Sequence, residues 1–154
     1  MKKEDKINFL VRKAKLSDVN QIYHLGSKIE ELEFLSEFTF HEKYELREFL
    51  SHPKENILLL AVVKKGIVGF IYAKILARSN GGWCMLDNIA VLKKYRGQGI
   101  GSSLLKELYK ELKRIKINYV QILEEIHHKK TRAFWKSKGF KEKKVFIWAE
   151  EIIK

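Results

Sequence analysis

The stretch Arg96-Gly97-Gln98-Gly99-Ile100-Gly101-Ser102 joins an apolar run to an amphipathic one, and it decides the fold of this chain. Before it lies the run Met85–Leu92, which has the composition of a buried strand. After it, leucines at positions 104, 105, 108 and 112 recur with the period of a helix. Glycines at such a junction let backbone N–H groups turn inward, and the helix N-terminus adds about half a positive charge. The sequence therefore predicts a phosphate-binding loop.

The spacing of the glycines narrows the choice of ligand. A dinucleotide fingerprint needs Gly-x-Gly-x-x-Gly, whereas Gly97, Gly99 and Gly101 alternate with single residues. The chain also lacks the strand-end acid expected about 20 residues later to hold a ribose. The Gly-Lys-Ser/Thr of a nucleotide P-loop is absent as well. For the glycine run taken alone, an ordinary strand-to-helix turn stays open as an alternative.

The remaining pattern, Arg-x-x-Gly-x-Gly, resembles the pyrophosphate-binding motif of the GNAT family of acetyl-coenzyme A-dependent N-acetyltransferases. Three other segments are similar to that family in the same order. They are Phe9–Ala14 with the following Ser17-Asp18, the triplet Ile89-Ala90-Val91, and Phe134-Trp135 followed by Gly139-Phe140. The resemblance covers nearly the whole chain. It implies an enzyme that moves an acetyl group from acetyl-CoA to a primary amine by direct attack in a ternary complex.

Length and composition agree with one domain over residues 1–154. A chain of 154 residues with 45% hydrophobic residues can bury roughly two-thirds of its unfolded surface. The longest purely apolar run, Ile57–Val63, is too short to span a bilayer, and the charged start has no secretory pattern. The only cysteine, Cys84, excludes internal disulfides and fits a reducing compartment. We expect a cytoplasmic protein with no membrane partner.

The charge balance favours anionic partners without choosing among them. The formal net charge is +12, a field that attracts coenzyme A phosphates, RNA or DNA. No helix-turn-helix, zinc or aromatic-ribbon signature is present, so a nucleic-acid partner is not favoured. Acetylation of an amine carried on RNA stays open as an alternative, and so does a homodimer.

Hydrophobic periodicity predicts an α/β (α+β) domain with a mixed sheet. The resemblance implies a GNAT-like domain whose central sheet has six or seven strands flanked by about four helices. The expected strands cover residues 6–14, 56–64, 67–76, 83–92, 119–125 and 145–153. The expected helices cover residues 18–27, 41–51, 130–138 and the segment from the glycine loop to 115.

The resemblance assigns the cofactor site residue by residue. The pyrophosphate would be held mainly by backbone N–H groups of Arg96, Gly97, Gln98, Gly99, Ile100, Gly101 and Ser102. The backbone along Ile89, Ala90 and Val91 would pair with the pantetheine arm and orient the acetyl carbonyl. His128 stands where the family often has an asparagine that contacts the cofactor, and a surface loop residue is the other interpretation.

Amide formation from an ammonium needs a base, often acting through a water. Asp87 is the first candidate, because several family members carry an acid at this strand position. Strand alternation places Gln121, Leu123 and Glu125 on one face, which makes Glu125 a second candidate and leaves Glu124 open. For each of these acids, the alternative interpretation is a solvent-exposed carboxylate at a strand end that takes no part in catalysis.

Trp135 is the third candidate catalytic residue, and it departs from the family pattern. The resembled enzymes commonly have a tyrosine there, which protonates the departing thiolate, whereas an indole N–H does not titrate in this range. This departure leaves a second function open, an acetyl-CoA-binding regulatory module with little turnover. Cys84 has no partnered histidine and is expected to be a buried structural thiol. No residue pair repeats a zinc spacing, so no metal site is expected.

The acceptor is expected to be a small-molecule or peptide amine. Carboxylates interleaved with aromatic residues precede the second helix and are a candidate cation-binding stretch. They are Glu30, Glu31, Glu33 and Glu37, with Phe34, Phe38 and Phe40. A helix end with charges outward and aromatics inward explains the same pattern. The sequence does not choose among polyamine, aminoglycoside, amino acid, protein N-terminus and lysine side chain.

Overall fold

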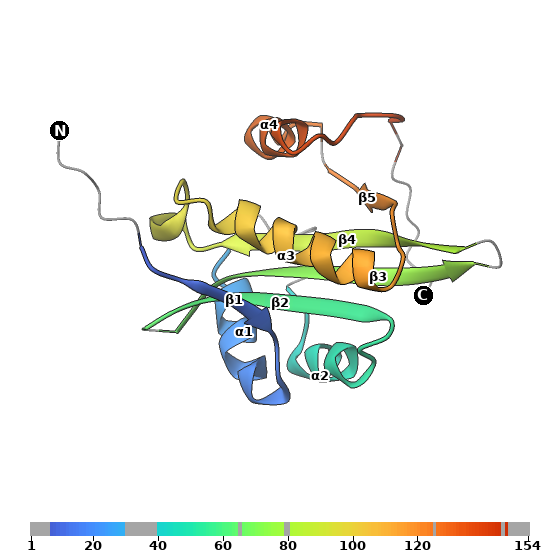
Figure 1. Cartoon of the computed structure of the whole chain (residues 1–154). Coiled ribbons are helices and arrows are strands. Elements are labelled where there is room, and N and C mark those ends of the chain that lie inside the picture. The colour runs from blue at the N-terminus through green and yellow to red at the C-terminus, as the bar shows by residue number, and fades with distance from the viewer. Residues whose placement is uncertain are drawn as a thin grey trace, which may run out of the picture. The chain divides into compact units, whose positions relative to one another are not determined.

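A mixed sheet with the strand order β1-β2-β3-β4-β5 lies at the centre of the fold (Figure 1). Its strands are β1 (Leu10–Lys13), β2 (Asn56–Val63), β3 (Gly66–Arg78), β4 (Gly81–Val91) and β5 (Val120–Ile122). Neighbours from β1 to β4 are antiparallel, and β5 joins β4 in parallel. The computed structural model describes residues 7–29, 40–64, 66–78, 81–124, 126–145 and 147.

The predicted fold class is confirmed, with fewer strands than expected among the described residues. Five strands form the sheet there, against six or seven in the prediction. The strand expected at 145–153 lies outside the described residues apart from 145 and 147, which are not in a strand. The strand expected at 119–125 is shorter, because only Val120–Ile122 pairs with β4.

Four α-helices accompany the sheet in the described part of the chain. They are α1 (Val19–Gly26), α2 (Lys43–Ser51), α3 (Ile100–Arg114) and α4 (Lys129–Ser137). Short 3-10 turns precede two of them, η1 (Leu16–Asp18) before α1 and η3 (Lys93–Tyr95) before the glycine loop. The chain divides into an N-terminal unit, Met1–Leu123, and a C-terminal unit, Glu124–Lys154, which contains α4.

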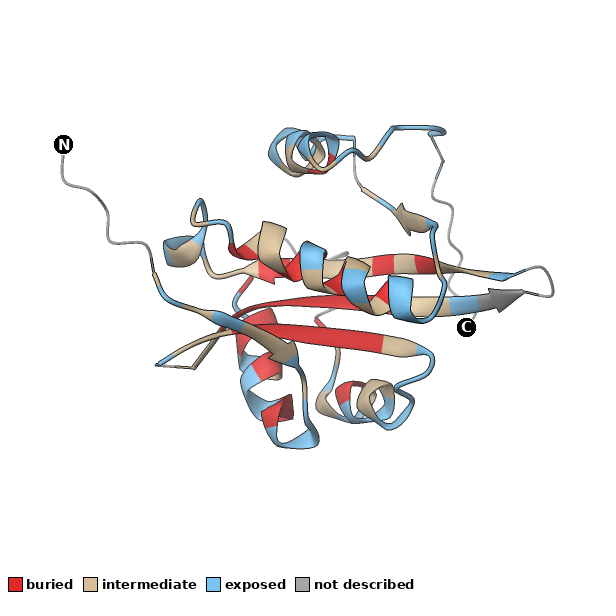
Figure 2. Cartoon of the chain, in the orientation of Figure 1, coloured by how far each residue is buried: buried red, intermediate tan, exposed pale blue. Residues whose placement is uncertain are grey.

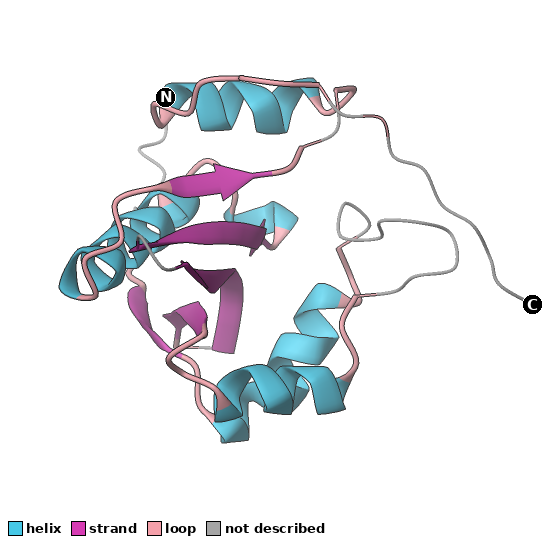
Figure 3. Ribbon diagram, turned by 90° about the vertical axis from the view of Figure 1, so that its right-hand side faces the viewer, coloured by secondary structure: helices cyan, strands magenta, loops and turns pink. Residues whose placement is uncertain are grey.

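Within the N-terminal unit, α1 and α2 cover one face of the sheet and α3 covers the other (Figures 1 and 3). Strand alternation directs Leu58, Leu60, Phe70 and Tyr72 toward the α1 side, where they join one buried cluster. The intervening Leu59, Ala61 and Ile71 face α3. Burial on both faces explains why β2 reads as a continuous apolar run, and Figure 2 shows β2 buried along most of its length and β3 buried over its middle part.

The leucines after the glycine loop behave as their spacing predicts. Ile100, Leu104, Leu105, Leu108 and Leu112 are all buried on the sheet side of α3. Their burial fixes the helix axis across the sheet and so fixes where its N-terminus lies. No helix in the described ranges is long and apolar enough to cross a membrane.

The N-terminal end of α1 is held to β1 by a partly buried ion pair. Arg12 binds both carboxylate oxygens of Asp18 at 2.7 and 2.8 Å, and the Lys15 backbone N–H donates to the same carboxylate at 2.8 Å. Asp18 is the N-cap residue of α1. Its side chain, however, points back to β1 and η1, because Arg12 offers a stronger, charge-assisted bond.

Candidate functional site

The glycine loop connects the end of β4 to the start of α3, as the sequence predicted. Gly97 and Gly99 have φ values of 79° and 82°, in the left-handed region that favours glycine. A Cβ built on either residue would meet no protein atom within 4 Å. The glycines are therefore required by the backbone conformation and not by crowding from the protein, and the space beside them is open to a ligand.

The N-terminus of α3 suits an anionic group. Its N-cap residue is Gly99, and no side chain caps the helix. The first N–H groups of a helix have no partner inside it, and the helix dipole makes this end positive. The side-chain oxygen of Gln98 is buried without a hydrogen-bond partner among the described residues. Arg96 Nε donates to the Val91 carbonyl at 2.8 Å, which ties the loop to the end of β4.

A β-bulge interrupts β4 just before the cofactor triplet. Tyr72 pairs with Asn88 and Ala73 with Leu86, which leaves Asp87 without a partner on β3. A bulge re-aims the side chain at that point and reverses the alternation of the backbone beyond it. The Cys84 N–H accordingly points to the Tyr119 carbonyl at 2.9 Å, whereas that of Leu92 points to Val68 on β3, also at 2.9 Å.

Beyond the bulge, one edge of β4 carries no strand among the described residues. The strand β5 pairs only with Cys84, Met85 and Leu86. Because N–H directions alternate back from Leu92, those of Ile89 and Val91 face this open edge, and that of Ala90 faces β3. These two N–H groups have no strand to pair with in the described part of the chain, and pairing of Ile89 and Val91 with an extended ligand stays a prediction.

The carboxylate of Asp87 holds an ammonium group. Lys74 Nζ lies 2.9 Å from Asp87 Oδ2, with the two side chains 43% and 23% exposed. The same Nζ lies 5.8 Å from the ring centroid of Phe49 and 5.7 Å from that of Tyr72. These two rings are stacked, with centroids 4.5 Å apart at 15°. Sequence reasoning missed this group, because its members come from α2, β3 and β4 and no local spacing relates them.

His41 lies against the same ring pair. Its imidazole meets Phe49 edge-on at 5.0 Å and Tyr72 at 5.8 Å, and Nδ1 is 3.7 Å from Glu45 Oε2. Burial lowers the pKa of His41, and Lys74 adds to this, while Glu45, the Asn88 side chain and Asp87 oppose it. The imidazole is therefore neutral at pH 7. The sequence placed His41 only at the start of a helix.

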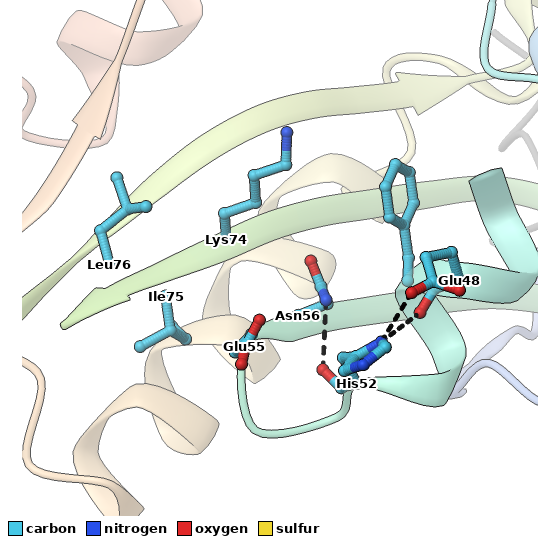
Figure 4. A pocket seen from close by; sticks show the side chains of 8 residues that line it. Glu48, His52, Glu55, Asn56, Lys74, Ile75 and Leu76 are labelled. Carbon is cyan, nitrogen blue, oxygen red and sulfur yellow. Dashed lines mark hydrogen bonds and ion pairs between the residues drawn. The ribbon is translucent and has the colours of Figure 1, made fainter.

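A cavity of about 300 Å³ opens beside Lys74, between the C-terminal half of α2 and the ends of β2 and β3 (Figure 4). Its lining includes Lys74, Phe49 and two acidic residues, Glu48 and Glu55. The cavity therefore shares Lys74 and Phe49 with the group around Asp87.

In the C-terminal unit, Trp135 and His128 bind the same carboxylate. The Trp135 side chain is buried, and its Nε1–H donates to Glu124 Oε2 at 3.2 Å. The other oxygen, Glu124 Oε1, lies 2.9 Å from His128 Nδ1. The indole N–H of Trp135 is thus engaged by Glu124, while Glu125 lies outside the described residues. The catalytic role of Trp135 and the cofactor role of His128 stay predictions.

Two further predictions meet different outcomes. Burial raises the pKa of Cys84 to about 12, so the thiol stays protonated, as expected of a structural cysteine. The acidic stretch at 30–39 lies outside the described residues, and only Phe40 at its end is placed, in the core against Gly26. Over the described ranges, no three His, Cys, Asp or Glu side chains form a group that would hold a metal ion.

Comparison with protein-family models identifies a family for this chain. A family profile described as "Acetyltransferase (GNAT) domain" matches residues 54–142, more than half of the chain.

Solved structures share the fold at low identity. An aminoglycoside acetyltransferase from an uncultured soil metagenomic sample superposes with a TM-score of 0.78 at 15% identity, covering 95% of this chain and 97% of that one. The paia N-acetyltransferase of Thermoplasma acidophilum, solved with coenzyme A, superposes with a TM-score of 0.79 at 18% identity, covering 91% of this chain and 94% of that one. Glucosamine-6-phosphate N-acetyltransferase of Arabidopsis thaliana superposes with a TM-score of 0.74 at 16% identity, covering 93% of this chain and 98% of that one.

Proposed function

This chain belongs to the GNAT acetyltransferase family, and we propose that it transfers an acetyl group from acetyl-coenzyme A to a primary amine of a small molecule or peptide. The domain of this activity spans residues 1–154, and the single cysteine supports a cytoplasmic location. The observation that carries the proposal is the uncapped N-terminus of α3 behind two left-handed glycines, continuous with the open edge of β4.

The loop would hold the diphosphate of the donor through backbone N–H groups from Gly97 to Ser102. Such groups are oriented before the ligand arrives, so little reorganisation opposes binding. The N–H groups of Ile89 and Val91 would align the extended arm along β4, and the thioester would then lie beside Asp87. The donor supplies an activated acetyl group on sulfur.

Within that arrangement, the amine nitrogen attacks the thioester carbon, the new C–N bond forms, and the C–S bond breaks. The proton lost by the amine passes to Asp87, directly or through a water, and the sulfur leaves as a thiolate that water protonates. An amine with a pKa near 10 needs such a base, whereas a thiol pKa of about 8.5 makes the sulfur a fair leaving group. Backbone N–H groups facing the carbonyl would stabilise its developing negative charge.

The direct test is thiol release from acetyl-CoA across a panel of amines, peptides and aminoacylated RNAs. Release with any acceptor supports the proposal, and release only with RNA would favour the RNA-borne amine. The buried Trp135, whose N–H is engaged by Glu124, motivates one other function, a regulatory module that binds acetyl-CoA with little turnover. Tight acetyl-CoA binding without release for any acceptor would favour that module, and failure to bind acetyl-CoA would reject both.

Asp87 is the residue on which the proton transfer depends. We expect Asp87→Asn to lower kcat/KM most at low pH, where the acceptor amine is hardest to deprotonate, with a loss of about 10²-fold. The acetyl-CoA Kd should change little, because asparagine keeps the size of the side chain and the diphosphate would be held by backbone N–H groups of the loop. A loss that is equal at every pH would remove Asp87 from the role of base.

A further inference from the structure

The ammonium group of Lys74 occupies a cation site that three other side chains build. Asp87 supplies a carboxylate at 2.9 Å, and Phe49 and Tyr72 present aromatic rings within 5.8 Å of Nζ. A carboxylate combined with two aromatic rings is a favourable environment for an alkylammonium ion. The side chains beside the β4 bulge therefore suit an alkylammonium ion.

The walls of this site are held independently of Lys74. Tyr72 is buried, and its hydroxyl donates to Asn56 Oδ1 at 2.9 Å. Burial raises the pKa of Tyr72, so the hydroxyl stays a donor. Phe49 stacks on Tyr72, and His41 meets both rings edge-on. Removing Lys74 would leave these side chains in place.

Lys74 itself is held only weakly. Its side chain is 43% exposed, and a part-exposed ion pair contributes little net free energy. The stem has four rotatable bonds, and solvent solvates the ammonium well. A second ammonium of higher affinity can therefore take its place beside Asp87.

The adjoining cavity is lined by two carboxylates, together with Lys74 and His52. The net charge of the chain is +12, yet Glu48 and Glu55 line the cavity of about 300 Å³ next to Lys74. Figure 4 shows Lys74, Glu55 and Glu48 around it. Glu48 Oε1 is also 3.3 Å from His52 Nδ1, so Glu55 is the carboxylate with more freedom to receive a new cation.

We propose that this is the acceptor subsite and that it takes a linear aliphatic diamine. One ammonium replaces that of Lys74 between Asp87, Phe49 and Tyr72, and the second lies in the cavity near Glu55 and Glu48. The lysine stem is itself a butylammonium, which is why the subsite fits an unbranched alkylamine. Lys74 is an internal competitor that keeps the site filled until an acceptor displaces it. The assignment as an acceptor subsite rests on the proposed function, whereas binding of the diamine does not.

Calorimetric titration with 1,4-diaminobutane tests the cation site directly. We expect Lys74→Ala to lower the Kd about fivefold, the scale of one part-exposed ion pair. The matched control is Lys110→Ala, which removes a surface lysine paired with Glu107 on α3 and should leave the Kd unchanged. Adding Phe49→Leu to Lys74→Ala should reverse the gain, with circular dichroism verifying the fold. An unchanged or higher Kd in Lys74→Ala overturns the proposal.

A second titration tests the acidic cavity. We expect 1,4-diaminobutane to bind more tightly than 1-aminobutane, and Glu55→Gln to narrow that difference. Equal affinity of the two amines overturns the placement of a second cation.

Acetylation assays separate this proposal from the proposed function. If ring-borne amines release thiol from acetyl-CoA and linear diamines do not, the enzyme assignment stands and the diamine subsite is wrong. If acetyl-CoA fails to bind but the diamine binds more tightly to Lys74→Ala, the cation site stands and the acetyltransferase assignment is wrong. Turnover of linear diamines, with a lower acceptor KM in Lys74→Ala, supports both.

Discussion

At the scale of single residues, the loop glycines differ from one another in what they require. Gly97 and Gly99 need glycine because of a positive φ, while Gly101 lies inside the first turn of α3. The sequence pattern treats all three alike, since it records spacing and not backbone conformation. A substitution at Gly99 therefore has two separable effects, backbone strain and an obstructed ligand.

Gly99→Ala should lose about 1–2 kcal/mol of stability from the left-handed backbone, together with most of the acetyl-CoA-induced rise in Tm. The matched control is Gly139→Ala in the C-terminal unit, where φ is 88° and a Cβ also meets nothing within 4 Å. That variant should lose similar stability and keep the rise in Tm. Thermal denaturation with and without acetyl-CoA measures both quantities, and equal rises in the two variants would contradict a ligand at Gly99.

His41 should make the protein less stable in acid. Its folded pKa lies below the ordinary 6.5 because of burial, so the unfolded chain binds the proton more readily. Stability from this group is present above pH 6.5 and declines as pH falls below it. The charged neighbours are Glu45 on α2, Lys74 on β3 and Asp87 on β4.

Urea denaturation of wild type and His41→Gln between pH 7.5 and 5 checks this expectation. The stability advantage of the wild type should shrink toward pH 5. His52 is the opposite control, because Glu48 raises its pKa, and any effect of His52→Gln should have the reverse sign. A pH-independent difference for His41→Gln would show that the imidazole does not titrate differently on folding.

At the scale of secondary-structure elements, the Arg12–Asp18 pair links β1 to α1. Asp18 is 6% exposed, and Arg12 lowers the pKa of its carboxyl group through a two-pronged hydrogen bond. This carboxylate contributes stability above its ordinary pKa of 3.8, and the contribution is lost as pH falls through the lowered folded value.

Arg12→Met should destabilise the protein at pH 7 by about 2–3 kcal/mol. A fully buried pair broken on one side costs about 3–5 kcal/mol, and the partial exposure of Arg12 reduces that figure. Urea denaturation at pH 7 and pH 3 should show a smaller difference at pH 3, where Asp18 begins to protonate. The exposed pair of Lys110 and Glu107 serves as the control, and Lys110→Ala should change stability little.

The elements also explain which boundaries were predictable. The strand and helix around the loop were expected at 83–92 and up to 115, and they run as β4 to Val91 and α3 to Arg114. Both are long and strongly periodic, so local pattern suffices. The strand β5 was expected to be longer, but its pairing with β4 stops at Leu86, just before the bulge. The point at which two strands stop pairing is decided by the sheet, and the apolar pattern of the sequence does not predict it.

At the scale of the whole molecule, the net charge of +12 bears on how the donor associates. A basic protein attracts a ligand that carries several phosphate charges, and salt screens that attraction over about 8 Å at physiological ionic strength. The Kd for acetyl-CoA should therefore rise severalfold between 50 mM and 500 mM salt. Isothermal titration measures the change in Kd. A Kd that does not change with salt would show that uncharged contacts, and not charge attraction, supply the binding free energy.

The local charge at the proposed acceptor subsite differs from the positive net charge of the chain. Glu48 and Glu55 line one cavity, and Asp87 pairs with Lys74 at its side, although lysines are spread along the whole chain. The net charge of the chain therefore does not predict the local charge of this cavity. The prediction of anionic partners, which was based on net charge, applies to the proposed acetyl-CoA donor and not to the proposed acceptor.

The sequence by itself determined the family, the mixed fold class and the position of the glycine loop between strand and helix, because glycine spacing and hydrophobic periodicity are local properties of the chain. Only the tertiary structure brought Lys74 to Asp87 and set Phe49, Tyr72 and His41 around them. These residues lie up to 46 positions apart. Their contact depends on how α2 packs on the sheet and on the one-residue bulge at Asp87. Neither feature can be predicted from the local spacing of residues.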